Sequence, residues 1–307
     1  MEKFRVAAVQ VAASGFDAIA SIAKLHDWTA RAAAADARLV VFPEAFVGGY
    51  PKGLDFGARV GSRTQAGRDW FRRYAAGAIA VPGPETALMG DAALTNNVFL
   101  VTGVIEKDGG TLYCTALFFA PDGALLGRHR KLMPTAAERL VWGFGDGSTL
   151  PVFDTPLGRL GAVICWENYM PALRMAMYAQ GITLYCAPTV DDRESWLPTM
   201  RHIAMEGRCF VISACQFVRR CDYEADYPID GDVPADRVLI RGGSCIIGPL
   251  GEVLAAPLFD TEGMVSAEID PADIVRGKYD FDVVGHYARP DVFRLLVDKE
   301  AKFAVSP

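Results

Sequence analysis

Three separate segments of the chain carry side chains that could cooperate in nucleophilic catalysis, and one of them contains Cys165. This cysteine lies between the apolar stretch of residues 158–164 and an expected helix that begins at Pro171. The partial positive charge at a helix start lowers the pKa of a thiol and favours the nucleophilic thiolate. Most cysteines are instead buried and inert. We expect that fate for Cys114, Cys186, Cys209, Cys215 and Cys245, and a more exposed position for Cys221.

A carboxylate that could serve as the base follows another apolar stretch. Glu44 comes directly after residues 38–42 and is flanked by Phe42 and Phe46. Apolar surroundings raise the pKa of a carboxyl group, which makes it a better proton acceptor near neutral pH. Taken alone, a glutamate at this position is more often an ordinary loop residue. Glu44 is therefore a candidate base only in combination with the other two segments.

The third segment is basic and irregular. It runs His129-Arg130-Lys131-Leu132-Met133-Pro134, and Glu138 and the glycine-rich residues 143–148 follow it. A lysine held by such a segment could supply positive charge to a developing anion. In isolation, a solvated basic turn is the commoner interpretation.

The elements that must position these groups alternate between strand and helix. Residues 4–10 and 38–42 have the pattern of strands, and residues 17–37 have helical spacing, which favours an α/β organisation. Further strands are expected at 97–106, 111–120, 158–164, 182–187, 209–215, 241–248 and 253–258, and helices at 171–180 and 196–207. Glu44 and Cys165 each follow a strand. Sites in α/β sheets collect beyond the carboxyl ends of strands, so the two could meet in one pocket.

Composition narrows the class of protein. The 307 residues are 51% hydrophobic and 22% charged, which suits a globular domain. A net charge of −6, with a richest basic cluster of only residues 128–131, argues against nucleic acid as a partner. No apolar run reaches the ~18 residues of a membrane span, and the N-terminus has the pattern of a first strand rather than a signal peptide. Seven cysteines spread over the chain predict a reducing, cytoplasmic setting.

Other uses of cysteine and histidine find less support. The chain has no CxxC pair and no HxxxH spacing, so we expect no metal site. Residues 145–148 lack the lysine and spacing of a phosphate-binding loop. A Cys–His dyad, with His202 or His286 beside Cys165, stays open at this point.

Taken together, the three segments resemble the nitrilase superfamily, which is characterised by a Glu–Lys–Cys triad in this chain order. The matching motifs are Phe42-Pro43-Glu44-Ala45-Phe46, Lys131-Leu132-Met133-Pro134-Thr135 and Cys165-Trp166-Glu167-Asn168. The last two, with Glu138-Arg139 and the following Gly-Asp-Gly-Ser, are similar to the true nitrilase branch. Relatives that act on amides usually carry a small or aromatic residue and an Asp after the cysteine. The resemblance extends from about Phe4 to Asp298.

This resemblance implies an α/β fold, a four-layer α–β–β–α sandwich. It implies a single carbon-nitrogen hydrolase domain over residues 1–307, with a short C-terminal extension from about residue 285. It also implies a homodimer or higher homo-oligomer that associates through helices. Because the chain ends at Pro307, soon after Gly285-His286-Tyr287, the resemblance supports a dimer better than it supports long spirals.

The resemblance further implies that a small-molecule nitrile is converted to its carboxylic acid and ammonia without a cofactor. Cys165 would attack the nitrile carbon, Glu44 would move the proton, Lys131 would stabilise charge, and Glu138 would help to position the triad. Candidate pocket walls are Tyr50, His129, Trp142, Trp166 and Thr189.

Three alternatives remain at this stage. One is an amidase or carbamoyl hydrolase of the same superfamily, and another is an enzyme restricted to cyanide. The third is a non-catalytic scaffold on this fold, which would usually have lost the triad.

Overall fold

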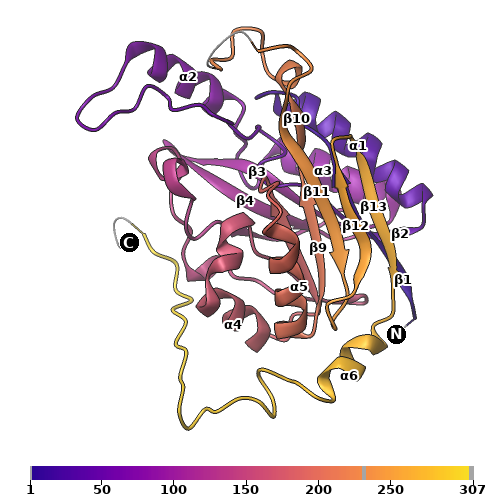
Figure 1. Ribbon diagram of the computed structural model, residues 1–307. Coiled ribbons are helices and arrows are strands. Elements are labelled where there is room, and N and C mark those ends of the chain that lie inside the picture. The colour runs from indigo at the N-terminus through magenta and orange to yellow at the C-terminus, as the bar shows by residue number, and fades with distance from the viewer. Residues whose placement is uncertain (1, 230–232, 304–307) are drawn as a thin grey trace.

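The computed structural model describes residues 2–229 and 233–303. Strands and helices alternate along much of the chain (Figure 1), in agreement with the expected α/β class. The helices are α1 (Ala18–Ala34), α2 (Gln65–Ala76), α3 (Pro84–Asn96), α4 (Pro171–Ala179), α5 (Trp196–Gly207) and α6 (Ala272–Lys278). The strands are β1 (Phe4–Gln10), β2 (Ala37–Val41), β3 (Phe99–Asp108), β4 (Thr111–Phe119), β5 (Leu125–Arg130), β6 (Phe153–Thr155), β7 (Gly158–Ala162), β8 (Leu184–Thr189), β9 (Phe210–Cys215), β10 (Phe217–Arg219), β11 (Val238–Ile247), β12 (Val253–Phe259) and β13 (Gly263–Ile269).

The strands form two mixed sheets. The first has the order β13-β1-β2-β3-β4-β5, and its strands β1, β2 and β3 run parallel. The second has the order β10-β11-β9-β8-β7-β6, with β12 paired to β11, and its strands β7, β8 and β9 run parallel. Each sheet therefore has a parallel centre whose strand ends can carry functional loops.

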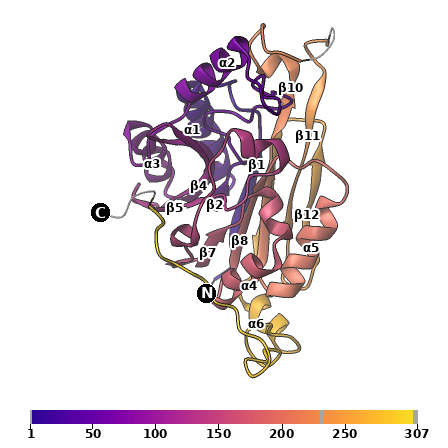
Figure 2. The same cartoon turned by 90° about the vertical axis from the view of Figure 1, so that its left-hand side faces the viewer.

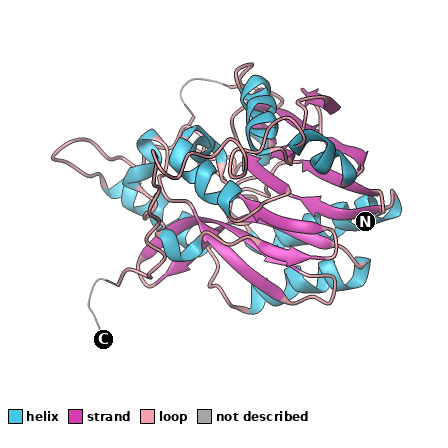
Figure 3. Ribbon diagram, turned by 90° about the horizontal axis from the view of Figure 1, so that it is seen from below, coloured by secondary structure: helices cyan, strands magenta, loops and turns pink. Residues whose placement is uncertain are grey.

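The two sheets pack face to face, and helices cover the outer face of each. Buried side chains such as Leu39 and Val101 of the first sheet and Leu184 and Ile212 of the second fill the space between the sheets. Helices α1 and α3 bury apolar side chains against the first sheet, and α4 and α5 do so against the second. Figures 2 and 3 show these outer helices with the strands between them. The expected four-layer α–β–β–α sandwich is confirmed.

Several elements had no clear pattern in the sequence. No element was expected at residues 65–76 and 84–96, which form α2 and α3, and β5 and β13 were also missed. In helix α2, charged residues interrupt the apolar ones and only Gly67 and Tyr74 are buried, so no long apolar run marks this helix in the sequence. By contrast, β1 and α5 coincide with the expected bounds.

The chain after α6 follows the outside of the molecule. Within the described residues 279–303 there is no helix or strand, and the segment passes the end of α4 in Figure 1. Lys302 donates its backbone N–H to Asp146 Oδ2 at 2.8 Å, which ties this segment to the loop before β6. No helix in the described part of the chain is both long and apolar enough to cross a membrane.

Candidate active site

Glu44 lies in a tight turn that follows β2. The next residue, Ala45, has a φ of +51°, so the backbone reverses direction directly after the glutamate. Gly103 of β3 makes room for this turn, because a Cβ there would lie 2.4 Å from the Pro43 carbonyl oxygen. Gln216, which lies between β9 and β10 of the other sheet, donates its Nε2 to the Glu44 backbone carbonyl at 2.7 Å. Both sheets therefore position this fully buried side chain.

Lys131 follows β5 and directs its amine at two carboxylates. Its Nζ lies 2.6 Å from Glu44 Oε1 and 2.8 Å from Glu138 Oε2. Its backbone N–H donates to the Cys114 carbonyl at 2.8 Å, which extends the strand pairing. Burial alone would lower the pKa of Lys131, but the surrounding negative groups outweigh burial and raise the pKa well above its usual value. The side chain is therefore a buried ammonium ion.

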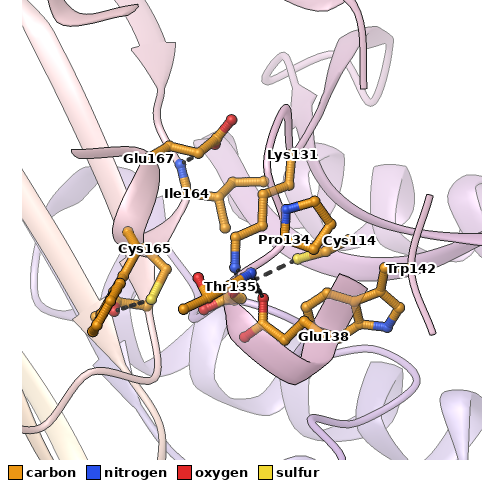
Figure 4. Close-up of polar contacts among 12 residues, drawn as sticks. Cys114, Lys131, Pro134, Thr135, Glu138, Trp142, Ile164, Cys165 and Glu167 are labelled. Carbon is orange, nitrogen blue, oxygen red and sulfur yellow. Dashed lines mark hydrogen bonds and ion pairs between the residues drawn. The ribbon is translucent and has the colours of Figure 1, made fainter. Parts of the chain in front are cut away.

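Glu138 holds the second side of this ammonium ion (Figure 4). Its Oε2 also accepts the Thr135 backbone N–H at 2.6 Å, and its Oε1 accepts the Tyr50 hydroxyl at 2.9 Å. Burial raises the pKa of Tyr50 far above its usual range, so this hydroxyl keeps its proton and acts as a donor. Three donors thus hold the Glu138 side chain in place, and Glu138 in turn restricts where the Lys131 amine can move.

Cys165 is the first residue of the 3₁₀ helix η3 (Cys165–Tyr169), shortly after β7. Its φ of +51° is unusual for a residue with a side chain, and such backbone strain is frequent at active sites. Thr189, at the end of β8, donates its Oγ1 to the Cys165 sulfur at 3.2 Å. The Asn168 side chain donates to the backbone carbonyls of Val163 and Cys165 at 2.9 and 2.8 Å. Hydrogen bonds to the sulfur and to the nearby backbone carbonyls therefore hold this strained turn.

Glu167 links the cysteine turn to the lysine segment. Its Oε2 accepts the Ile164 backbone N–H and faces His129 Nε2, both at 2.9 Å, and its Oε1 accepts the Leu132 backbone N–H at 2.6 Å. Burial alone would lower the pKa of His129, but attraction and hydrogen bonding to Glu167 raise it overall. Since Leu132 is next to Lys131, this carboxylate ties the nucleophile turn to the ammonium ion.

The structure changes the expected protonation of the thiol. Burial raises the pKa of Cys165, the negative charge of Glu44 raises it further, and Lys131 opposes both only in part. The prediction that a helix start lowers this pKa is therefore wrong, because a short 3₁₀ helix does not compensate for full burial. Burial also raises the pKa of Glu44, as expected, while Lys131 opposes that shift. The resting sulfur is a thiol that needs a base, and Glu44 lies beside it.

A cavity of about 190 Å³ opens beside the sulfur. Its walls are Tyr50, Lys52, Thr135, Glu138, Cys165, Trp166, Val190, Asp191, Asp192 and Arg193. Of the side chains expected as walls, Tyr50 and Trp166 lie here, and Thr189 is buried directly behind the sulfur.

The other two expected wall residues lie elsewhere. Trp142 lines a neighbouring cavity of about 340 Å³, with its ring 5.4 Å from the Lys131 amine. His129 does not line either of these two cavities, and its ring is fully buried between Glu167 and the Thr149 carbonyl. The strand pattern around His129 could not show on which side of β5 the ring lies.

Some residues at the site had not been singled out in the sequence. Gly103 is one, although a glycine inside a strand often marks a close backbone approach. Asp191 is another: its Oδ2 accepts the Trp166 indole N–H at 2.9 Å, and its carboxylate pairs with Arg193. The Arg193 guanidinium stacks on the Trp166 ring at 4.6 Å. This arrangement forms the rim of the cavity, and only the fold brings its members together.

The two histidines that were considered as dyad partners of Cys165 have other neighbours. The His202 side chain is exposed on α5, 3.6 Å from Glu206, and the His286 ring packs against Tyr287. The sulfur of Cys165 instead accepts the Thr189 hydroxyl. In the part of the chain that the structure describes, no group of three or more His, Cys, Asp or Glu side chains could hold a metal ion.

Comparison with known proteins points to the same family as the motifs that supply these site residues. A family model described as carbon-nitrogen hydrolase matches residues 5–279. The chain is 58% identical to an aliphatic nitrilase of Sinorhizobium fredii (strain HH103), with 99% of each protein covered. It is 54% identical to a bifunctional nitrilase/nitrile hydratase of Nicotiana tabacum, covering 98% of this chain and 88% of the other.

Among solved structures, the fold is similar to Saccharomyces cerevisiae Nit3, described as a member of branch 10 of the nitrilase superfamily. The TM-score is 0.71 at 24% identity, and the match covers 93% of this chain and 97% of that one. At this level of identity, the likeness concerns the fold alone.

Proposed function

This chain belongs to the carbon-nitrogen hydrolase family, and we propose that it is a nitrilase that converts an organic nitrile to its carboxylic acid and ammonia. One observation carries the proposal. A buried thiol, Cys165, shares a cavity with Glu138, and Lys131 joins that carboxylate to Glu44 through contacts of 2.8 and 2.6 Å. The identity of 58% to an aliphatic nitrilase over nearly the whole chain supports nitriles as the substrates.

In the first half of the reaction, Glu44 takes the proton of Cys165 as the sulfur attacks the nitrile carbon. The C–S bond forms while one C–N π bond opens, and the nitrogen receives a proton, which gives a thioimidate. Lys131 is already ionised and already held in place, so it can stabilise negative charge on the nitrogen without reorganising. Glu138 limits the position of that ammonium ion.

In the second half, two molecules of water complete the hydrolysis. The first adds to the thioimidate carbon, and collapse of the tetrahedral state breaks the C–N bond and releases ammonia, which leaves a thioester on Cys165. Glu44 then accepts a proton from the second water, which attacks the thioester and frees the carboxylic acid and the thiol. The cycle needs only the side chains of this chain, because the nitrile carbon is itself the electrophile.

The proposal includes a single catalytic domain with a C-terminal extension from about residue 285, a homodimer or higher homo-oligomer, and a cytoplasmic location. Exposed apolar side chains support self-association: Met205 of α5 is 39% exposed, and Leu250 in the β11–β12 turn is 52% exposed. All seven cysteines are free, six of them buried and Cys221 exposed, which suits a reducing compartment.

A panel of aliphatic, aromatic and arylacetonitriles, each paired with the matching amide, tests the function. Ammonia, acid and amide should be quantified for the wild type, for Cys165→Ala, and for Cys186→Ala as a control that removes a different buried thiol. We expect nitrile turnover in the wild type and in the Cys186 variant, and none in the Cys165 variant.

Two results would replace the proposal. Hydrolysis of amides without any hydrolysis of nitriles would make the protein an amidase of the same family. Electrophile labelling that modifies Cys165 no faster than the inert Cys186, with no turnover of any substrate, would favour the scaffold.

A further inference from the structure

We infer that Cys114, a second buried cysteine, is a positioning residue for the base Glu44: it occupies one carboxylate oxygen together with Lys131 and leaves the other to receive the proton of Cys165. The inference rests on the proposed role of Glu44 and deepens it. Cys114 lies on β4 of the first sheet, and its side chain had been expected to be ordinary core packing.

The contacts of the two Glu44 oxygens are unequal. Oε1 lies 2.6 Å from the Lys131 amine and accepts the Cys114 thiol at 3.5 Å. Oε2 is buried and has no hydrogen-bond partner among the residues that the structure describes. A buried carboxylate oxygen without a donor is costly, so such an atom in an active site calls for a functional explanation. Because Oε1 already faces two donors, Oε2 is the oxygen able to accept a further proton.

The thiol of Cys114 is suited to act only as a donor. Burial raises its pKa well above the usual value, and the negative charge of Glu44 raises it further. The sulfur therefore keeps its proton, and the weak S–H bond can point to the carboxylate. The Cys114 backbone carbonyl also accepts the Lys131 N–H, so this residue contacts both members of the ion pair.

Cys186 provides a matched comparison within the same core. It is also fully buried between the two sheets, and burial is the sole cause that raises the pKa of its thiol. Replacing either cysteine by alanine removes one sulfur from the same apolar layer. Only the replacement at Cys114 removes a donor from Glu44.

The experiment measures how fast iodoacetamide modifies Cys165 as a function of pH, with mass mapping of the site, and the pH dependence of kcat/KM for a nitrile. The variants are Cys114→Ala, Cys114→Val and Cys186→Ala. Valine fills the space of the sulfur but donates nothing, so it separates packing from hydrogen bonding and supplies a second variant if alanine impairs folding.

Loss of a donor destabilises the ionised carboxylate and raises the pKa of Glu44. We expect the acidic limb of both profiles to move upward by about 0.5–1 pH unit in both Cys114 variants. At a fixed pH on the acidic limb, the alkylation rate and kcat/KM should be about 3- to 10-fold lower than in the wild type, which is the same shift expressed as a rate. The Cys186 variant should keep the wild-type limb.

An unchanged limb in the Cys114 variants would overturn the inference, and so would recovery of the wild-type limb by valine, since packing would then be the cause. The alkylation profile needs no nitrile. A wild type that hydrolyses no nitrile would therefore contradict the proposed function, while the alkylation profile would still decide the role of Cys114.

Discussion

Removal of the Glu167 carboxylate should damage both stability and activity, because this one side chain joins the nucleophile turn to the lysine segment. In Glu167→Ala, three groups lose their acceptor: the backbone N–H groups of Ile164 and Leu132 and the ring of His129. The side chains of His129 and Glu167 are completely buried, so water cannot replace the lost contacts without opening the core.

The size of the effect follows from these contacts. A buried donor left without an acceptor costs about 1–3 kcal/mol. The Ile164 N–H and the His129 ring are fully buried, so together they should lower the free energy of unfolding by about 2–6 kcal/mol. The contact with Leu132 is only partly buried and adds less. Since a whole domain is stable by roughly 5–15 kcal/mol, the variant should lose a large fraction of its stability.

Urea unfolding gives the measurement, with Glu262→Ala as the control because Glu262 is an exposed glutamate. The control should stay within about 0.5 kcal/mol of the wild type. In the folded fraction of Glu167→Ala, alkylation of Cys165 should also slow, since the cysteine turn loses its support. A variant with wild-type unfolding and wild-type alkylation would refute the reasoning that this carboxylate holds the two segments together.

Three further changes test single contacts. Replacement of Thr189 by valine removes the hydroxyl that donates to the Cys165 sulfur and should slow alkylation of that sulfur about 3- to 10-fold; an unchanged rate would contradict a role for the hydroxyl. Because the pKa of His129 is raised in the folded state, its pairing with Glu167 stabilises the fold fully below its unfolded value of about 6.5, and this stability is lost as the pH rises through the raised folded value. In His129→Gln, the free energy of unfolding measured with urea should therefore decline less steeply as the pH rises above about 6.5. An unaltered slope would exclude the His129–Glu167 pair as the source of the decline. Glu138→Gln should lower kcat for a nitrile less than Cys165→Ser does, as measured by ammonia release, and equal losses would make Glu138 as essential as the nucleophile.

The candidate residues could be found from the sequence because their local patterns are strong. Glu44 and Cys165 each follow a run of apolar residues that is long enough to be a strand, and this placement is visible without coordinates. Lys131 was found only through its resemblance to a family motif. In isolation its segment has the composition of an ordinary basic turn.

The positions of Cys114 and His129 could not be predicted in the same way. Both lie on strands of the first sheet, and alternation along a strand says which residues share a face but not what lies opposite that face. The residues next to Cys114 in the sequence are typical of a core cysteine, yet its thiol donates to Glu44. His129 was predicted to line the pocket, yet its ring is enclosed by Glu167 and a backbone carbonyl.

The sequence by itself determined the chemical types at the site and the alternation of strands and helices, because both depend on local composition and period. Only the tertiary structure decided how the groups act on one another. Glu44 follows a strand of the first sheet and Cys165 follows a strand of the second, so their meeting depends on how the two sheets pack. Burial between those sheets is also what raises the pKa of Cys165 and makes a neighbouring base necessary, an effect that no local pattern contains.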